Sequence, residues 1–423
     1  MVLNDYRLSK IKLDIRGIRL SAEEILFYTG LILWTAQVYI GKTIYVDFYS
    51  GKLLTAVRYF CMLIFLFKIV ISEKNVLQKA AAVFVACGAI FVVVQRNINT
   101  GMPLIQILLM LYAARGIPFK RICKVLLWAC IFCWTVPVLV DKLGIFSLER
   151  KVYNERVREF LNFSYVSFAA IYFNNILFCT LYVYSDNDLQ GCGSNYARRR
   201  EVPWIILLLF GIMLRWLYAV TDTSLPFLVA MLYIFLYIMV IKLRFRWFRN
   251  TAPNRIMAAL LFPTLALFNY IVVKNYDKKV PIMKKINEMI HFRLSYPNEA
   301  LKRYGVHLFG TQIVENTDTT QGDYFYVDSG FMKNLINYGL IVFILILLLY
   351  SVMLYAAIIE HDKLLTIWLI CVAVYSLFNN LLLSPMENGS MFAIWYAIDL
   401  IKWHREKKTK MRTDKRRQNE YGA

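Results

Sequence analysis

Charged side chains are scarce in this chain: Asp, Glu, Lys and Arg make up only 18% of its 423 residues, whereas 59% of the residues are hydrophobic. The mean hydropathy is +0.49. Soluble domains do not have this composition, so it indicates a protein whose apolar segments span a membrane. The apolar runs are uniform instead of alternating between apolar and polar residues, which excludes a membrane-spanning barrel and leaves helices.

Other chemical signals are also missing. None of the eight cysteines lies in the long polar segment 274–330, and most fall in apolar runs, so they are predicted to be buried core residues and not disulfides. The sequence has no convincing phosphate-binding glycine loop, zinc-ligand spacing or serine-nucleophile motif. We therefore predict no cofactor and no metal. No internal repeat is visible.

The apolar runs predict an all-α polytopic integral membrane protein with about twelve transmembrane helices. Residues 24–273 are expected to contain nine of them and residues 331–403 three more, with basic tails at 1–23 and 404–423 and a large loop carrying short helices at 274–330. The short helices are expected at 283–292 and 298–304. The expected spans are residues 24–41, 53–71, 77–95, 98–114, 122–140, 164–184, 203–221, 224–241, 255–273, 331–356, 364–383 and 389–403.

The distribution of Lys and Arg predicts the orientation of these spans. Basic residues crowd both tails and every second connection, such as 198–200 and 242–249, whereas the short connections 221–223 and 384–390 contain none. Basic loops remain in the cytoplasm, so both termini are predicted to be cytoplasmic and segment 274–330 extracytoplasmic. The net charge of +21 then faces the headgroups of the lipid bilayer and requires no nucleic acid as partner.

Polar residues inside the predicted spans gather at one depth, the outer level. Such residues are costly in a membrane and often mark function, so we predict that they share a polar cavity that opens outward. The alternative for any single residue is a snorkelling arginine or a hydrogen bond between helices. The five residues are Arg58, Arg215, Asn269, Asn379 and Asn380.

The two predicted outer loops add arginines at the same level. Arg156 and Arg158 lie in loop 141–163, and Arg293 and Arg303 lie in segment 274–330. The planar guanidinium group binds phosphate oxygens in pairs and keeps its charge at every physiological pH, so these loops suit a diphosphate anchored in the outer leaflet. The alternative is ordinary contact with lipid phosphates.

Several short motifs, in order along the chain, resemble those of the Wzy-type bacterial polysaccharide polymerases of capsule, exopolysaccharide and O-antigen biosynthesis. Residues 158–165 resemble the pattern Arg-x-Phe-Leu-Gly-Phe-Gly-Tyr, with Asn162 and Ser164 in place of the glycines. Residues 218–223 resemble a short outer turn of the family. Arg293-Leu294 resembles a loop motif before which His291-Phe292 replace a common glycine, and further similarity lies at 304–305, 308–310, 327–329 and 338–339.

The resemblance implies a glycosyltransferase of the bacterial cytoplasmic membrane that needs no metal. It would move a growing glycan from polyprenyl diphosphate to an incoming lipid-linked oligosaccharide unit at the outer face. Arginines would stabilise the leaving diphosphate and a base would accept the hydroxyl proton. Catalytic candidates are Asp328 and, as competing base, His307, with Arg158 and Arg293 on the diphosphate. Candidates for binding the diphosphate or glycan are Arg58, Arg215, Arg156, Arg303, Asn269, Asn379, Asn380 and Tyr304.

Two other functions remain open. A ligase that transfers a finished glycan to another acceptor would share most of these residues. A flippase for the same lipid-linked units would need charged residues near the midplane and two related halves, neither of which is visible here. By analogy with the family, a flippase and a chain-length regulator are expected partners of a polymerase.

Overall fold

Helices dominate the computed structural model of the chain, which describes residues 12–15, 18–48, 51–72, 98–146, 151–153, 156–185, 201–316 and 324–403. The strands among these residues form two small antiparallel hairpins, β1 (Lys12–Ile15) with β2 (Ile18–Ser21) and β3 (Lys151–Tyr153) with β4 (Arg156–Arg158). The expected span 77–95 and both ends of the chain, 1–11 and 404–423, lie outside the described residues. The predicted all-α class is confirmed.

Among the described residues, six helical segments are long and apolar enough to cross a membrane, and three apolar helices are shorter. This agrees with a membrane protein, but the described residues do not show the twelve expected spans. The six are α2 (Gly51–Ser72), α5 (Phe119–Lys142), α7 (Trp204–Thr221), α8 (Ser224–Tyr237) with the π-helical η3 (Ile238–Lys242), α9 (Ala252–Lys274) and α12 (Gly330–Ile359). The shorter apolar helices are residues Pro103–Ala113 of α4 (Ile98–Ala113), α6 (Phe168–Tyr184) and α13 (Lys363–Tyr375).

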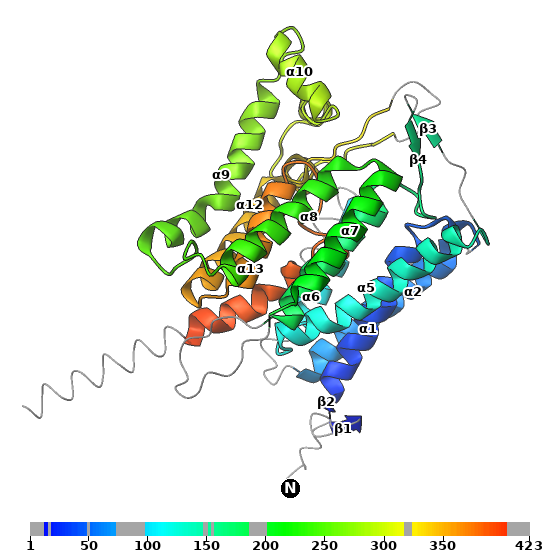
Figure 1. The fold of residues 1–423 in the computed structure, drawn as a ribbon, viewed down its shortest axis with the longest axis vertical. Coiled ribbons are helices and arrows are strands. Elements are labelled where there is room, and N and C mark those ends of the chain that lie inside the picture. Colours follow the sequence, from blue (N-terminus) through cyan, green and yellow to red (C-terminus); the bar gives the residue numbers. More distant parts are fainter. Residues whose placement is uncertain are drawn as a thin grey trace, which may run out of the picture.

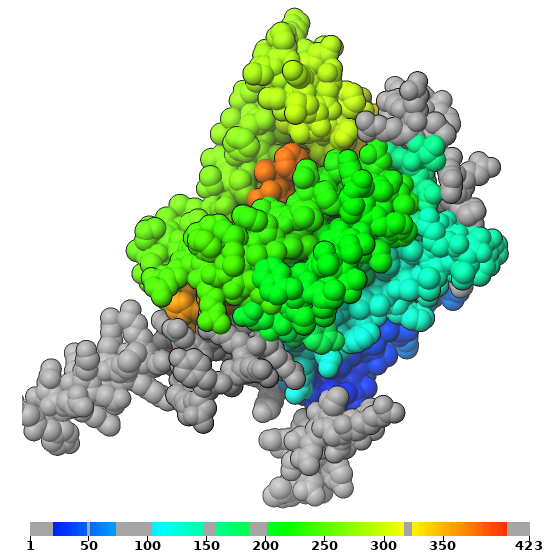
Figure 2. Space-filling model, viewed as in Figure 1, coloured from blue at the N-terminus to red at the C-terminus, as the bar shows by residue number. Residues whose placement is uncertain are grey.

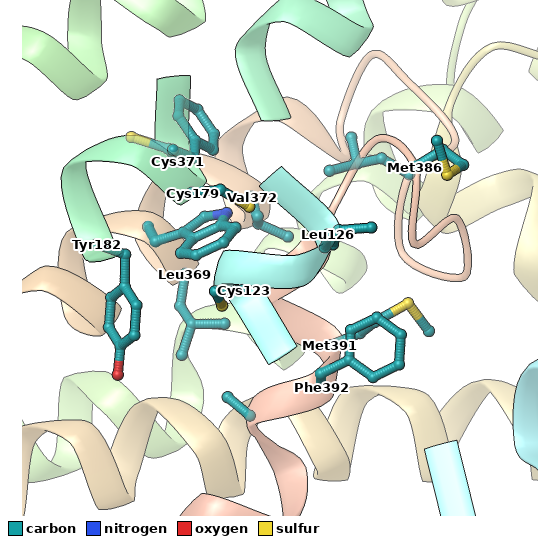
Figure 3. Close-up of a cluster of buried hydrophobic side chains, with 14 of the residues drawn as sticks. Cys123, Leu126, Cys179, Tyr182, Leu369, Cys371, Val372, Met386, Met391 and Phe392 are labelled. Atoms are coloured by element: carbon teal, nitrogen blue, oxygen red, sulfur yellow. The ribbon is translucent and has the colours of Figure 1, made fainter. Parts of the chain in front are cut away.

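The helices pack into one bundle (Figure 1). Helix α1 (Ala22–Ile40) packs against α2 and α5, α5 packs against α6, and α12 packs against α9 and α13. The buried cysteines lie among aromatic and aliphatic side chains of the core, and Figure 3 shows Cys123, Cys179 and Cys371 in one group with Leu369 and Val372. The prediction that the cysteines are small core residues is confirmed for five of those described, whereas Cys133 is only partly buried.

Large apolar side chains also cover the outside of the bundle. Phe132 of α5 is 71% exposed and Leu63 of α2 is 62% exposed. Exposed apolar surface on this scale is not tolerated in water and is the surface that a bilayer covers. Further exposed residues on α7 and α9 are Ile205, Leu208, Leu209, Ile212, Leu260, Leu267, Phe268 and Ile271.

Helix α12 is interrupted at Gly339, where the backbone adopts φ 81° and ψ 173°. This conformation is open to glycine alone. The break allows segment 307–311 to pack on the helix: Leu340 N–H donates to the carbonyl of His307 at 2.9 Å, and Thr311 N–H donates to that of Ile336 at 2.7 Å. A Cβ on Gly339 would lie 2.2 Å from the nitrogen of Gly310.

The expected span 364–383 is wrong in its second half. Helix α13 ends at Tyr375, and the chain follows an irregular path to η5 (Gly389–Phe392), after which residues 393–403 are helical. The apolar run 381–383 had extended the predicted span, yet the backbone of residues 381–389 forms local turns and bonds to side chains of other helices. Tyr350 donates its hydroxyl to the carbonyl of Leu382 at 2.7 Å, and Asn175 accepts from Gly389 N–H at 2.9 Å. Irregular backbone is tolerated in a membrane protein where it is buried by protein in this way.

Segment 274–330 contains two short helices, α10 (Pro281–Met289) and α11 (Ser295–Tyr304), close to the two helices expected there. Both lie at one end of the bundle, beyond the end of α9 (Figure 1). Helix α11 packs on α9 and α12, and Leu294, Ala300 and Phe325 form a second buried cluster with Val273 and Ile336 of those helices. The segment is therefore fixed to the bundle by an apolar core of its own.

Candidate functional site

Two catalytic candidates, Arg293 and Asp328, meet in the structure. Arg293 Nη2 lies 3.4 Å from Asp328 Oδ2, and the two side chains are only 18% and 23% exposed. The guanidinium group also donates from Nε to the carbonyl of Phe378 at 3.0 Å and from Nη1 to that of Ile290 at 3.1 Å. The pair thus joins the segment after α10, the residues before α12 and the irregular segment after α13.

The position of Arg293 is set by a tight turn at the end of α10. His291 and Phe292 adopt left-handed φ values of 54° and 61°. Asn287 closes the turn, because its Oδ1 accepts the backbone N–H groups of Leu294 and Ser295, both at 3.0 Å. The carboxamide oxygen thereby satisfies backbone N–H groups at the start of α11, which have no partner within that helix.

Asp328 lies beside the start of α12, where Ser329 caps the helix by accepting from Met332 N–H at 3.4 Å. Burial raises the pKa of the Asp328 carboxyl above its ordinary value, and the positive charges of Arg293 and Lys333 oppose this shift. The carboxylate is thus held next to a cation in a poorly hydrated site, which is the environment that tunes catalytic acids and bases.

A second ion pair lies beside the first. Lys333 Nζ donates to the two carboxylate oxygens of Glu315 at 2.8 and 2.7 Å and lies 4.3 Å from the ring centre of Tyr326. Glu315 also accepts from Val327 N–H at 3.1 Å. The negative charge of Asp328 interacts electrostatically with Tyr326 and with Tyr165, which lies three residues before the start of α6. Together with Glu387, which is described next, these groups form what we call the polar cluster. Its members are Tyr165, Arg293, Glu315, Tyr326, Asp328, Lys333 and Glu387.

Glu387 completes the polar cluster from the irregular segment after α13. Its Oε2 accepts from Asn379 Nδ2 at 3.3 Å. Burial raises the pKa of Glu387 to about 7, while Lys42 and the hydroxyl of Ser384 act in the opposite direction. A carboxyl with a pKa near neutrality exchanges protons readily at physiological pH, which is the property that a general base needs.

Arg158 is held nearby by a different partner. Its Nη2 lies 3.2 Å from Asp222 Oδ2, with the two side chains 26% and 23% exposed. Asp222 is presented by the turn that follows α7, where it adopts φ 50°. The positive charge of Arg158 acts on Tyr165, so this pair lies at the border of the polar cluster.

The three predicted asparagines also converge near the start of α12. Asn269 accepts from the Ser329 hydroxyl at 2.9 Å, next to Asp328, and Asn380 accepts from Asn334 Nδ2 at 3.0 Å. Asn379 donates to Glu387 as described above. The expectation that Asn379 and Asn380 lie on a helix is wrong, because both follow the end of α13.

The remaining candidates are not brought into the polar cluster among the described residues. Arg215 is exposed on α7 and lies 5.8 Å from the ring centre of Tyr218, as expected for a snorkelling arginine, and Arg58 is half-buried on α2. Arg303 forms an exposed ion pair with Glu299 on α11. The predicted cavity shared by all five polar residues of the spans is therefore not found for the two arginines.

His307 and Tyr304 hold the backbone of their own segment together. His307 Nε2 lies 2.9 Å from the carbonyl of Tyr304, and the Tyr304 hydroxyl accepts from Val314 N–H at 3.1 Å. Arg156 begins β4. These contacts indicate structural roles for the histidine and the tyrosine.

Sequence reasoning missed Glu387, Glu315, Lys333, Lys42 and Tyr165. Glu387 lies in a connection that was read as a short outer turn, and Lys333 was read as the first turn of an apolar span. For the charged residues among them, the only local signal was their position directly before or after a long apolar run, and the ends of many helices share this feature.

In Figure 2 the C-terminal part of the chain, coloured orange, reaches the surface between the yellow-green segment 274–330 and the green helices α7 and α8.

The arrangement can bind an anion through two cations, Arg293 and Lys333, and can accept a proton through Asp328 or Glu387. No three His, Cys, Asp or Glu side chains lie close enough together to hold a metal ion in the part of the chain that the structure describes. Comparisons of the chain with protein-family models, curated proteins and solved structures give no match. The fold and the site thus define the protein as a helical membrane protein with a partly buried cluster of ion pairs at one end of its bundle.

Proposed function

We propose that the protein is a polysaccharide polymerase of the bacterial cytoplasmic membrane. It would join oligosaccharide repeat units carried on polyprenyl diphosphate, with about twelve spans, cytoplasmic termini and segment 274–330 on the outer side. The observation that carries the proposal is the partly buried pair of Arg293 and Asp328, which combines an anion-binding group with a proton acceptor next to the start of a long apolar helix.

In the proposed reaction the hydroxyl oxygen at the end of the acceptor attacks the anomeric carbon of the donor glycan. The bond from that carbon to the diphosphate oxygen breaks, and its electron pair leaves with the diphosphate. Arg293 would stabilise this growing negative charge by exchanging Asp328 for a phosphate oxygen, with Arg158 as a second cation at the border of the site. Fixed charges of this kind act without reorganisation during the reaction.

The proton of the attacking hydroxyl requires a base. Asp328 is suited to this role once the diphosphate has engaged Arg293, because the carboxylate is then released from its ion pair. Glu387 is the competing base, since burial raises its pKa to about 7. The two candidates are distinguished by the pH profile of the variants. Replacement of the base abolishes the acidic limb, where activity falls because the base becomes protonated, whereas replacement of the other carboxyl only shifts that limb.

Two local backbone conformations support the resemblance on which the proposal also rests. Asn162 stands where the polymerase pattern has glycine, and it adopts φ 62°. His291 and Phe292 stand near another such position and are also left-handed. Asparagine and histidine adopt this conformation more readily than most residues, so the glycine-like backbone is retained at these two places without glycine. Ser164, at the second glycine of the pattern, does not have a positive φ.

The proposal is tested in a strain that lacks the gene, complemented with the native chain or with Arg293→Ala or Asp328→Asn. Lipid-linked saccharides are extracted and sized. A polymerase predicts long chains with the native protein and single units on the outer face with either variant. Arg303→Ala is the matched control, because Arg303 lies in the same segment but is exposed and paired with Glu299.

The other outcomes identify the alternatives. Long chains that accumulate on the carrier without reaching their acceptor would indicate a ligase, and single units retained on the inner face would indicate a flippase. Either result would overturn the proposal. Normal chains from both variants, with the proteins present at native levels, would remove the polar cluster as the active site.

A further inference from the structure

Helix α10 exposes an apolar face that nothing in the described structure covers. Ile282, Ile286 and Met289 are 68%, 45% and 72% exposed, and they lie four and three residues apart, which places them on one side of a helix. The face continues at Phe292, which is 47% exposed. Apolar residues grouped in this way on a short helix at the end of a membrane span require a partner.

The orientation of this face is fixed by the protein. Asn287 is buried and binds Tyr276 and Ser295 in addition to the backbone of the following turn. Asn287 therefore fastens the inner side of α10 to the bundle. On a helical wheel the centre of the exposed apolar face lies about 130° from Asn287 and is turned away from the core.

The other side of α10 is charged. Lys284 is exposed and lies 4.0 Å from Glu288 one turn later. Lys285 is exposed at the edge of the apolar face, about 70° from its centre on a helical wheel. Lys278 and Lys279 are exposed directly before the helix. A short helix with an apolar face, an opposite charged face and flanking lysines is the pattern of helices that lie in the surface of an anionic bilayer.

The position of α10 in the chain agrees with this partner. Only residues 275–280 separate it from α9, whose exposed apolar side chains Phe268 and Ile271 belong to the surface that lipid covers. The end of a membrane span lies at the headgroup level, so a helix that follows after six residues lies near the same level.

We propose that α10 is an interfacial helix that binds anionic phospholipid, with Ile282, Ile286 and Met289 inserted at the boundary of the acyl chains and the neighbouring lysines on the lipid phosphates. This proposal is independent of the enzymatic function above. One consequence is that the bilayer surface, acting through Asn287 and the turn at 291–292, holds Arg293 at the level of the lipid headgroups.

The test uses the full chain in nanodiscs of phosphatidylcholine with phosphatidylglycerol. A nitroxide is attached at Ile282→Cys or, as the matched control on the opposite side of the same helix, at Lys284→Cys. Accessibility to oxygen and to a water-soluble nickel chelate is measured by electron paramagnetic resonance. The unmodified chain treated with the same reagent supplies the background signal of the native cysteines. Size-exclusion profiles confirm that each variant folds.

The label at residue 282 is expected to be severalfold less accessible to nickel, and more accessible to oxygen, than the label at residue 284. Replacing Lys278, Lys279, Lys284 and Lys285 by Gln in the Ile282→Cys variant should remove the effect of phosphatidylglycerol on this difference. Equal nickel accessibility at both positions would refute the proposal. Spin–spin broadening between labelled copies would also overturn it, because the apolar face would then be covered by a second copy of the chain.

Discussion

The break in α12 gives the sharpest test of the packing, through the substitution Gly339→Ala. The residue has φ 81° and ψ 173°, a conformation in which a non-glycine residue is strained by about 1–3 kcal/mol. The added Cβ would also lie 2.2 Å from the nitrogen of Gly310 and 2.5 Å from the carbonyl oxygen of Leu308. Both neighbours are backbone atoms, which cannot rotate away as a side chain could.

Relief of this overlap requires the segment that contains Leu308 and Gly310 to separate from α12. The hydrogen bonds at risk join Leu340 to His307 and Thr311 to Ile336, and each contributes about 1 kcal/mol. Added to the backbone strain, the expected loss in the free energy of unfolding is about 3–5 kcal/mol. A loss of this size is a large part of the stability of a typical domain.

The loss is measured by denaturant unfolding of the purified chain in mixed micelles. Gly144→Ala is the matched control, because Gly144 also has a positive φ of 67° but has nothing within 4 Å of an added Cβ. It should lose only the strain energy. If Gly339→Ala cost no more than this control, the close contact between the two segments would not exist in the protein.

Two further predictions concern the irregular segment after α13. Because burial raises the pKa of Glu387 from 4.5 to about 7, the native protein should lose about 3 kcal/mol as pH rises from about 4.5 through 7. The free energy of unfolding of the native chain and of Glu387→Gln is measured at pH 5 and pH 8, and the variant should not show this part of the loss. An equal loss in both proteins would contradict the raised pKa of Glu387. Asn175→Leu should cost about 2–4 kcal/mol, because the carbonyl of Pro385 and the N–H of Gly389 lose their buried partner. Unchanged denaturation midpoints in that variant would show that the segment does not depend on Asn175.

The sequence predicted the class of the protein because composition and the length of apolar runs are local properties. It also predicted the two short helices in segment 274–330 and the burial of the cysteines. It failed at residues 376–383, where the apolar run 381–383 extended the predicted helix past its end at Tyr375. Hydropathy measures how apolar a run is, but not whether its backbone groups bond within a helix or to side chains elsewhere.

The candidate site shows the same division. The residue types of Arg293 and Asp328 made both of them candidates, because a guanidinium group binds phosphate oxygens and a carboxylate accepts protons. Their pairing could not be predicted, since it joins residues 35 positions apart through the turn at 291–292. Arg215 and Arg158 looked equally suitable in sequence. The structure separates them, because Arg215 lies on an exposed side of α7, whereas Arg158 of β4 forms an ion pair with Asp222.

By itself, then, the sequence determined that this chain forms apolar helices that require a membrane, because the energetics of burial depend on composition and length. The tertiary structure alone decided which charged groups face one another. Glu387 joins the polar cluster because Asn175 and Tyr350 hold an irregular segment inside the bundle. Contacts of this kind depend on the packing of helices that are distant in sequence, and no local pattern of residues contains them.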